Sequence, residues 1–244
     1  MNREGMSARP RPSRPTVRRL GGAVAVLAGL AFCYLGFAQT AAGMLQIRGT
    51  ATVDMLRSGA PILPQTLAAG IADFERADAW WREPANSISI GVLEATPTAA
   101  GVPVVTDQNP IAAAELEFER AIAEAPGSAT AWARLAQARF VAEGGSRGTV
   151  DALMMSIKLA RVDPFLLADR AAVGLPIYRS LSPEERLRVA DQVRLLAHMS
   201  AETLDQLAEV AHDTGTTLTV VGILSGDLDA LYRFDGRMQV MFKK

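Results

Sequence analysis

The chain has 244 residues, of which 49% are hydrophobic, and enough apolar side chains are present to exclude a chain that is disordered throughout. Its single cysteine excludes a disulfide framework within the chain. The net charge of −1 excludes a basic surface spread over a whole domain, so we expect no nucleic-acid partner.

Residues 1–19 hold six arginines and one glutamate, a net charge of +5, so the rest of the chain carries −6. Three prolines lie among these arginines, and the segment has no apolar face to bury. We therefore expect residues 1–19 to form a disordered, basic, cytoplasmic tail.

An uncharged stretch, LGGAVAVLAGLAFCYLGFA, follows at residues 20–38, and the next charge is Arg48. As a helix it spans about 30 Å, the thickness of the hydrocarbon layer of a bilayer. The sequence predicts a transmembrane helix within residues 20–47, with the arginine-rich N-terminus in the cytoplasm. A cleaved signal peptide is the alternative, because small residues at 36–38 and 40–42 have the spacing of a cleavage site.

Small residues recur at every fourth position of this span. This spacing forms a shallow groove along a helix and predicts packing against another helix or a second copy of the span. Chance is the alternative, because glycine and alanine are common in membrane helices. The residues of the predicted packing face are Gly21, Ala25, Gly29 and Cys33.

Residues 48–65 are expected to be a linker with a short extended part. An amphipathic helix is expected at 66–83, where Leu67, Ile71 and Phe74 recur at helical spacing. A helix at 86–95 and a long loop at 96–110, which contains three prolines, come next. Asn109 is the expected cap of the following helix. Further helices are predicted at 111–125, 129–143, 149–162, 165–179, 183–199 and 201–212.

Strands are nearly absent from this prediction, so the expected fold class is all-α. Ser182 to Glu185 forms a capping box with proline in the first helical position, which marks the start of the helix at 183–199.

The stretch AELEFERAIAEAPGSATAWARLAQARF, residues 114–140, resembles the junction between two tetratricopeptide repeats (TPRs). In such a junction one helix pair ends at a proline and the next opens with tryptophan, leucine and a small residue. The resemblance implies that Phe118 and Trp132 fill the gap between neighbouring hairpins. Small residues then let the helices approach closely, here Ala114, Ala121 and Ala136.

Pro84, Pro126 and Pro164 would close successive hairpins at intervals of 42 and 38 residues, longer than the TPR period of about 34. The match weakens before Pro164, where Ser156 stands in place of an aromatic residue, and before Pro84, where Arg76 does. The resemblance implies TPR-like hairpins, an α-solenoid, over residues 66–181. Residues 182–244 are expected to form a helical C-terminal region.

The overall plan also resembles single-span proteins of bacterial exopolysaccharide or O-antigen assembly. Three stretches carry this resemblance: PILPQTLAAGIADFERADAWWREP at residues 61–84, APGSATAWARLAQARF at residues 125–140, and LSPEERLRVADQVRLLAHMS at residues 181–200. It implies a location in the bacterial inner membrane and a role in envelope polysaccharide biosynthesis or export.

No catalytic, cofactor-binding or metal-binding site is predicted. His198 and His212 lack the spacing of metal ligands, and no nucleophile or dinucleotide-binding motif is present. We therefore predict that the chain is not an enzyme, although pocket residues with perturbed pKa values cannot be recognised in a sequence. Four carboxylates are interpreted as part of a solvated helix face: Glu115, Glu117, Glu119 and Glu124.

Trp80 and Trp81 are adjacent, so one helix stripe cannot hold both. We expect one in the core and the other in a groove, an interface or at the membrane surface; burial of both between hairpins is the alternative. The partner-binding residues expected on the inner surface of a repeat array are Thr130, Ala133, Arg134, Gln137 and Phe140, and Trp81 is added as a further contact.

The leading hypothesis is a membrane-anchored periplasmic scaffold that binds protein partners of the envelope and holds no cofactor. The rival hypothesis is a structural accessory subunit of a membrane complex, which is held through the span and uses no groove.

Overall fold

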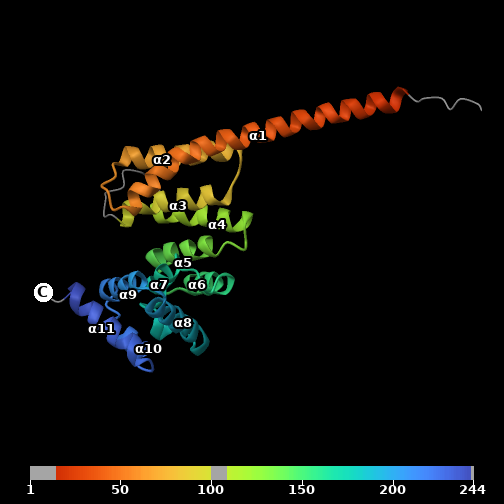
Figure 1. The fold of residues 1–244 in the computed structure, drawn as a ribbon. Helices are drawn as coiled ribbons and strands as arrows, with labels where there is room; N and C mark the ends of the chain where they lie inside the picture. Colours follow the sequence, from red (N-terminus) through yellow and green to blue (C-terminus); the bar gives the residue numbers. More distant parts are fainter. Residues whose placement is uncertain (1–14, 100–108, 243–244) are drawn as a thin grey trace, which may run out of the picture.

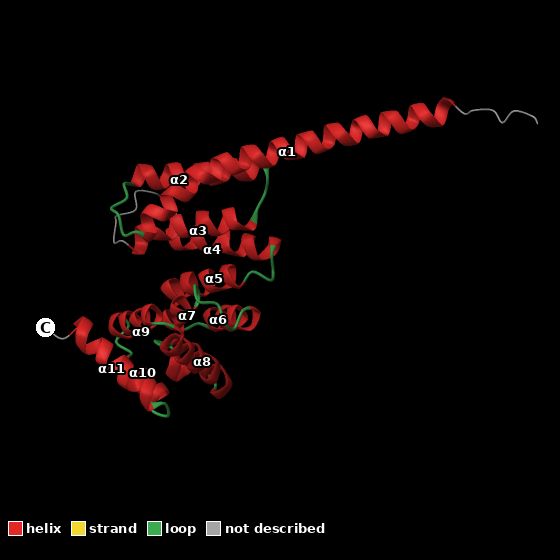
Figure 2. Ribbon diagram, in the orientation of Figure 1, coloured by secondary structure: helices red, strands yellow, loops and turns green. Residues whose placement is uncertain are grey.

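The computed structural model describes residues 15–99 and 109–242. Within these ranges the regular elements are all helices, as Figure 2 shows, which confirms the expected all-α class. The helices are α1 (Pro15–Arg57), α2 (Pro64–Trp80), α3 (Pro84–Ala99), α4 (Pro110–Glu124), α5 (Ala129–Glu143), α6 (Arg147–Leu159), α7 (Leu167–Gly174), the 3-10 turn η1 (Tyr178–Ser180), α8 (Pro183–Met199), α9 (Ala201–Asp213), α10 (Thr217–Leu224) and α11 (Leu228–Phe242).

The first six helices form three hairpins that stack in chain order: α1 with α2, α3 with α4, and α5 with α6 (Figure 1). Pro84, Pro126 and Pro164 each follow the second helix of a pair, so the hairpin boundaries expected from the prolines are confirmed. Proline has no N–H to donate and its ring clashes with the preceding turn, so it favours a helix boundary. Helix α3 nevertheless continues through Pro97 to Ala99, so the long loop expected from residue 96 begins later.

Helix α1 is longer than the sequence suggested. It begins at Pro15, inside the segment expected to be a disordered tail, and residues 1–14 lie outside the described part of the chain. It then continues to Arg57, so the linker expected at 48–65 is confined to residues 58–63. A helix can run this far because no proline interrupts it, and the chain turns only at Gly59, whose φ is 70°.

The second half of α1 is therefore the first helix of the first hairpin. A Cβ atom added to Gly49 would lie 2.7 Å from the Phe74 ring of α2, and one added to Gly70 of α2 would lie 3.0 Å from Thr52. These glycines allow the two helices to approach closely. Phe74 belongs to a small core that also contains Val53, Ile90 and Leu93.

The predicted junction between α4 and α5 forms as expected at its centre. Phe118, Ala114 and Ala136 are buried in one core cluster. Trp132 is only partly buried against this cluster, and its Nε1–H donates to the carbonyl of Pro126 at 2.9 Å. The ring of Phe118 thus fills the gap between hairpins, while Trp132 covers its edge.

The helix expected at 165–179 is shorter, because α7 ends at Gly174 and Pro176 follows. Helices α7 to α11 share a separate core, which includes Leu196, Leu207 and Phe234. Arg170 of α7 is 1% exposed between this half and the hairpins. Its guanidinium donates to the carbonyls of Ser156 and Ala160, both at 2.8 Å, and to Gln192 Oε1 at 3.1 Å.

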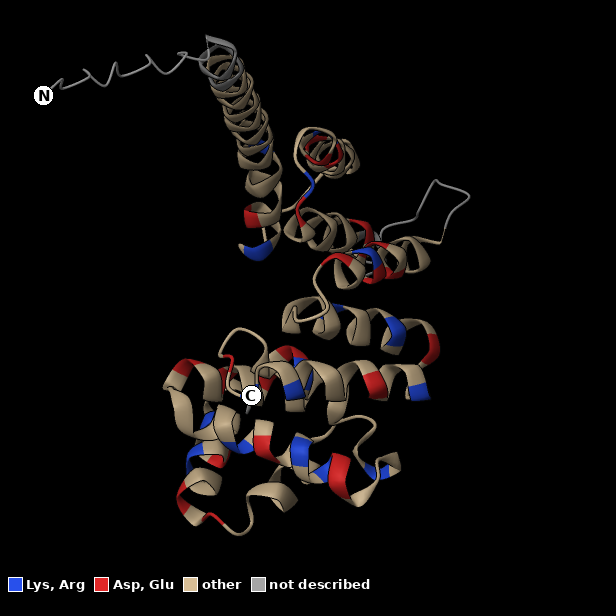
Figure 3. Ribbon diagram, turned by 90° about the vertical axis from the view of Figure 1, so that its right-hand side faces the viewer, with Lys and Arg blue, Asp and Glu red and all other residues tan. Residues whose placement is uncertain are grey.

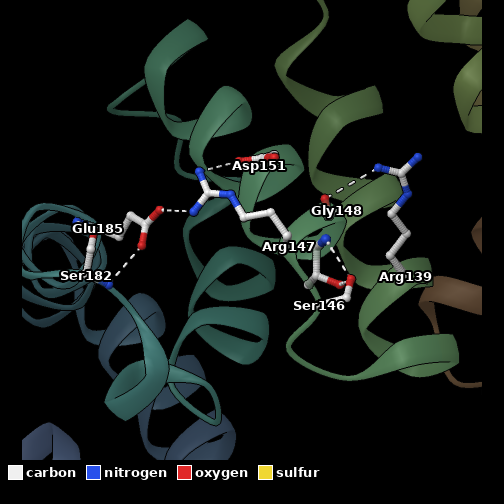
Figure 4. A network of polar contacts seen from close by, with 8 residues as sticks. Arg139, Ser146, Arg147, Gly148, Asp151, Ser182 and Glu185 are labelled. Carbon is white, nitrogen blue, oxygen red and sulfur yellow. Dashed lines mark hydrogen bonds and ion pairs between the residues drawn. The ribbon is translucent and has the colours of Figure 1, made fainter.

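A second group of polar contacts, around Arg147, connects α6 with α8 (Figure 4). Arg147 forms ion pairs with Asp151 at 2.7 Å and with Glu185 at 2.8 Å. Glu185 also accepts the backbone N–H of Ser182 at 2.8 Å, which completes the predicted capping box. These bonds hold the pKa of Glu185 below its usual range.

Candidate protein-binding groove

An apolar groove of about 500 Å³ lies at the end of the hairpins where α1, α3 and α5 finish and α4 begins. Eight of the ten side chains that line it are aliphatic, aromatic or threonine, and the two polar exceptions are on α5. The lining residues are Leu56 of α1; Val92, Ala95 and Thr96 of α3; Ile111 and Phe118 of α4; and Arg134, Gln137, Ala138 and Val141 of α5.

The polar edge of the groove is held in place by side-chain contacts. Arg134 donates to Gln137 Oε1 at 2.9 Å and pairs with Asp169 of α7 at 3.1 Å. Burial raises the pKa of Asp169 above its usual range, and Arg134 opposes that rise. The guanidinium is therefore fixed between Gln137 and Asp169 with part of its surface accessible beside the apolar lining.

Two of the expected partner-binding residues, Arg134 and Gln137, lie in this groove. Thr130 precedes Arg134 by four positions on α5, and its side chain is half-buried outside the lining. Phe140 packs partly buried against the core cluster of the hairpins, and Ala133 is buried. Trp81 lies elsewhere, directly after α2. The structure brings together part of the expected set.

Most of the groove was not anticipated from the sequence. Val141 follows Gln137 by four positions, so the spacing of Arg134 and Gln137 could have indicated it. The contributions of α1, α3 and α4 carry no signal in the sequence, because they depend on which helix ends meet in space.

A group of carboxylates lies between α2, α3 and α4. Burial, together with the nearby charges of Glu117 and Glu75, raises the pKa of Glu94 to about 7, and Arg120 opposes this. Glu117 is buried and pairs with Arg120 at 2.8 Å, so its interpretation as part of a solvated face was wrong. Packing of α4 against α3 turns this side of the helix inward.

The two histidines lie in the last turns of their helices, as expected. His198 Nε2 is 2.6 Å from Asp227 Oδ2, and the ring of His212 stacks on Phe242 at 4.0 Å between centroids. In the part of the chain that the structure describes, no group of three or more His, Cys, Asp or Glu side chains could hold a metal ion.

The part of α1 that projects from the other helices is residues 22–37, all of which are exposed. The predicted packing face of the span lies on this projecting part of α1. Ala25, Gly29 and Cys33 are exposed there, and a Cβ atom added to Gly29 would meet no atom within 4 Å. The side chain position of residue 21 lies outside the described residues. Packing of this face on another helix stays a prediction.

No family model and no curated protein match this chain. Among solved structures, the chain is similar to a thermophilic TPR protein of Thermus thermophilus, with 16% sequence identity and a TM-score of 0.49. That likeness covers 80% of this chain and 98% of the other. The order of helical hairpins described above rests on the structure of this chain itself.

Proposed function

We propose that this protein is a membrane-anchored helical scaffold that binds an apolar segment of another envelope protein in the groove between α1, α3, α4 and α5. The groove carries the proposal, because it is apolar, has a fixed polar edge and is built from four helices that belong to three successive hairpins. Binding of a protein segment needs such a surface and no catalytic group.

Anchoring is supported by the projecting part of α1. Between Gly22 and Ile47 it carries no charged side chain (Figure 3), and α1 is long and apolar enough to cross a membrane by length and composition. The arginines of residues 1–19 favour a cytoplasmic N-terminus and a periplasmic body at a bacterial inner membrane. A periplasm-active reporter fused after Lys244 should give signal, and the mature chain should begin near Met1. A mature N-terminus after Ala38 or Ala42 would instead identify a signal peptide.

The chemistry of the groove selects its occupant. An amphipathic helix could place apolar side chains over Val92, Ala95 and Val141 while a polar or acidic side chain meets Arg134 and Gln137. We therefore expect the partner to present an amphipathic helix that carries an acidic or amide side chain at its edge.

The pathway is part of the proposal as well. The resemblance of the overall plan to proteins of exopolysaccharide and O-antigen assembly supports envelope polysaccharide biosynthesis or export. Deletion of the chain should then reduce surface polysaccharide, and the full-length chain should restore it. An unchanged amount of surface polysaccharide would contradict the proposed pathway. It would not bear on the proposed binding in the groove, which has its own test.

A photocrosslinking amino acid at position 137 of the full-length chain tests the groove in native membranes. The crosslinked adduct should disappear with Val141→Asp, because a charge would then be buried against apolar side chains. Leu116→Asp is the matched control: Leu116 is 58% exposed and Val141 55%, but Leu116 lies outside the groove lining. An adduct that survives Val141→Asp, or that both substitutions remove equally, would contradict groove binding.

The rival role, a structural subunit held through its span, is favoured by the small-residue face of α1. In that case Gly29→Ile should break the assembly, whereas Val141→Asp should leave it intact. Co-purification of the two variants from detergent extracts separates the two roles.

A further inference from the structure

Trp80 and Trp81 are both solvent-exposed at the end of α2, with exposed fractions of 46% and 39%. The expectation that one of them is a core residue is therefore wrong, as is the alternative that both are buried. The helix ends here because the backbone of Trp81 is extended, and the bond from its N–H to the carbonyl of Ala77 is the last of the helix. Two adjacent, exposed indoles need a physical reason.

The exposed N-terminal part of α1 is about as long as a bilayer is thick. Every residue from Gly22 to Phe37 is exposed, and Ala38 is the first to be buried against the body. Arg18 and Arg19 stand immediately before the apolar stretch, which begins at residue 20. Residues 20–37 span about 27 Å as a helix, close to the hydrocarbon thickness of roughly 30 Å.

The same position on α1 meets the tryptophans. Phe37 and Trp80 are in edge-to-face contact, with ring centroids 5.7 Å apart. The connection from α2 to α3 lies beside the middle of α1, where α1 leaves the body (Figure 1). The length of the span and the start of packing against the other helices both place the lipid–water boundary near Phe37. Trp80 contacts Phe37 and therefore lies at this boundary.

The junction between span and body is fixed by polar contacts. Gln46 of α1 donates to Glu83 at 2.7 Å and to Asn86 at 3.0 Å, and Asn86 donates to Asp78 of α2 at 2.7 Å. Asn86 is fully buried. These bonds connect α1 to the turn that carries the tryptophans. The turn therefore keeps a fixed position along α1, and a fixed depth in the membrane when α1 crosses it.

We propose that Trp80 and Trp81 insert into the headgroup layer of the bilayer and fix the orientation of the hairpin array relative to the membrane. Tryptophan is enriched at this depth because its ring is apolar and its N–H stays hydrated. The turn holds one positive and one negative side chain: Arg82 pairs with Glu124 at 3.5 Å, and Glu83 accepts a hydrogen bond from the amide of Gln46. Because these two charges cancel, indole insertion rather than attraction to anionic lipid drives the contact. The proposal rests on the anchoring of α1 under the proposed function.

One consequence concerns the groove. Leu56, which lines it, is 19 positions beyond Phe37 on the same helix, a rise of about 28 Å. With the tryptophans in the headgroup layer, the groove opens well above the membrane. Its occupant is then a soluble segment of the partner rather than one embedded in the bilayer.

The experiment measures tryptophan fluorescence of the full-length chain in phosphatidylcholine nanodiscs whose acyl chains are brominated near the glycerol or near the methyl end. Trp132 stays in every variant as a common background. The wild type is compared with Trp80→Phe/Trp81→Phe, and two reporters are added to that double variant. Leu27→Trp lies in the middle of the span, and Tyr232→Trp lies on α11, which is at the opposite end of the molecule from α1 (Figure 1).

The wild type should lose most fluorescence with bromines near the glycerol, and the double variant should lose that quenching. Leu27→Trp should be quenched by bromines near the methyl end, and Tyr232→Trp by neither. Equal quenching of wild type and double variant, with Leu27→Trp quenched, would overturn the insertion of Trp80 and Trp81 and leave the anchor standing. An unquenched Leu27→Trp would overturn the anchor and the insertion together. Circular dichroism of each variant in the nanodiscs should match that of the wild type.

Discussion

Gly91 of α3 lies directly against the ring of Phe118 of α4. A Cβ atom added to Gly91 would be 2.6 Å from Cε1 of Phe118, and Phe118 is itself buried. The second hairpin therefore closes because the smallest residue faces one of the largest side chains. Phe118 thus packs on α3 within its own hairpin and shares a core cluster with Leu135 and Ala136 of α5 in the next one.

Gly91→Ala should destabilise the body by about 1 kcal/mol or more, because overpacking exceeds the gain in helix propensity. Urea unfolding of the full-length chain in detergent measures this change. Gly222→Ala is the control, since a Cβ there would meet no atom within 4 Å, and it should be neutral or stabilising by up to about 1 kcal/mol. Equal effects of the two substitutions would show that α3 and α4 do not pack as described.

Arg170→Met should cost at least about 3 kcal/mol, because the substitution leaves buried carbonyls and Gln192 without their donor. Arg170→Lys should recover little of this, since an ammonium cannot reproduce the guanidinium geometry. The free energy of unfolding in urea gives both values. Arg188→Met, which breaks an exposed pair with Glu184, should stay within about 0.5 kcal/mol. A small effect of Arg170→Met would place this side chain in solvent.

Glu94→Gln should stabilise the protein at pH 8 and have little effect at pH 4. The folded protein raises the pKa of Glu94 to about 7 from an ordinary value of 4.5, so it binds more protons than the unfolded chain between these values. Stability therefore falls as the pH rises from about 4.5 to about 7 and then levels off. Urea melts across this range measure the effect, with exposed Glu209→Gln as control. If Glu94→Gln leaves the pH dependence of the free energy of unfolding unchanged, that dependence arises from another group.

Gly29→Ile should abolish self-association or docking of the span, because a branched side chain would fill the groove between Ala25 and Cys33. Leu30→Ile keeps the hydrophobicity of the span and should preserve the association. A membrane two-hybrid assay of the full-length chain compares them. Equal signals would leave α1 as a plain anchor.

Local chemistry predicted most helix starts correctly. Asn109 accepts the N–H of Ile111 as a cap, Ser182 forms its capping box, and three prolines close three hairpins. These features depend on residues within a few positions of each other, so they can be recognised in the sequence.

Features that depend on tertiary contacts could not be predicted in this way. Arg170 looks like any surface arginine of a helix, yet it is buried because the α6 carbonyls and Gln192 surround it. Glu117 was assigned to solvent for the same reason. The groove combines the ends of four helices, of which only the α5 residues Arg134 and Gln137 were anticipated.

The central claim is that one uninterrupted helix serves both as membrane span and as first helix of the hairpin array. Amide hydrogen exchange of the full-length chain in lipid nanodiscs tests it most directly, over residues 38–57. We predict slow exchange throughout this segment, with fast exchange beginning only at residues 58–63, where α1 has ended. Fast exchange between Ala38 and Gly49 would reveal a flexible hinge where the span joins the hairpins and contradict the claim.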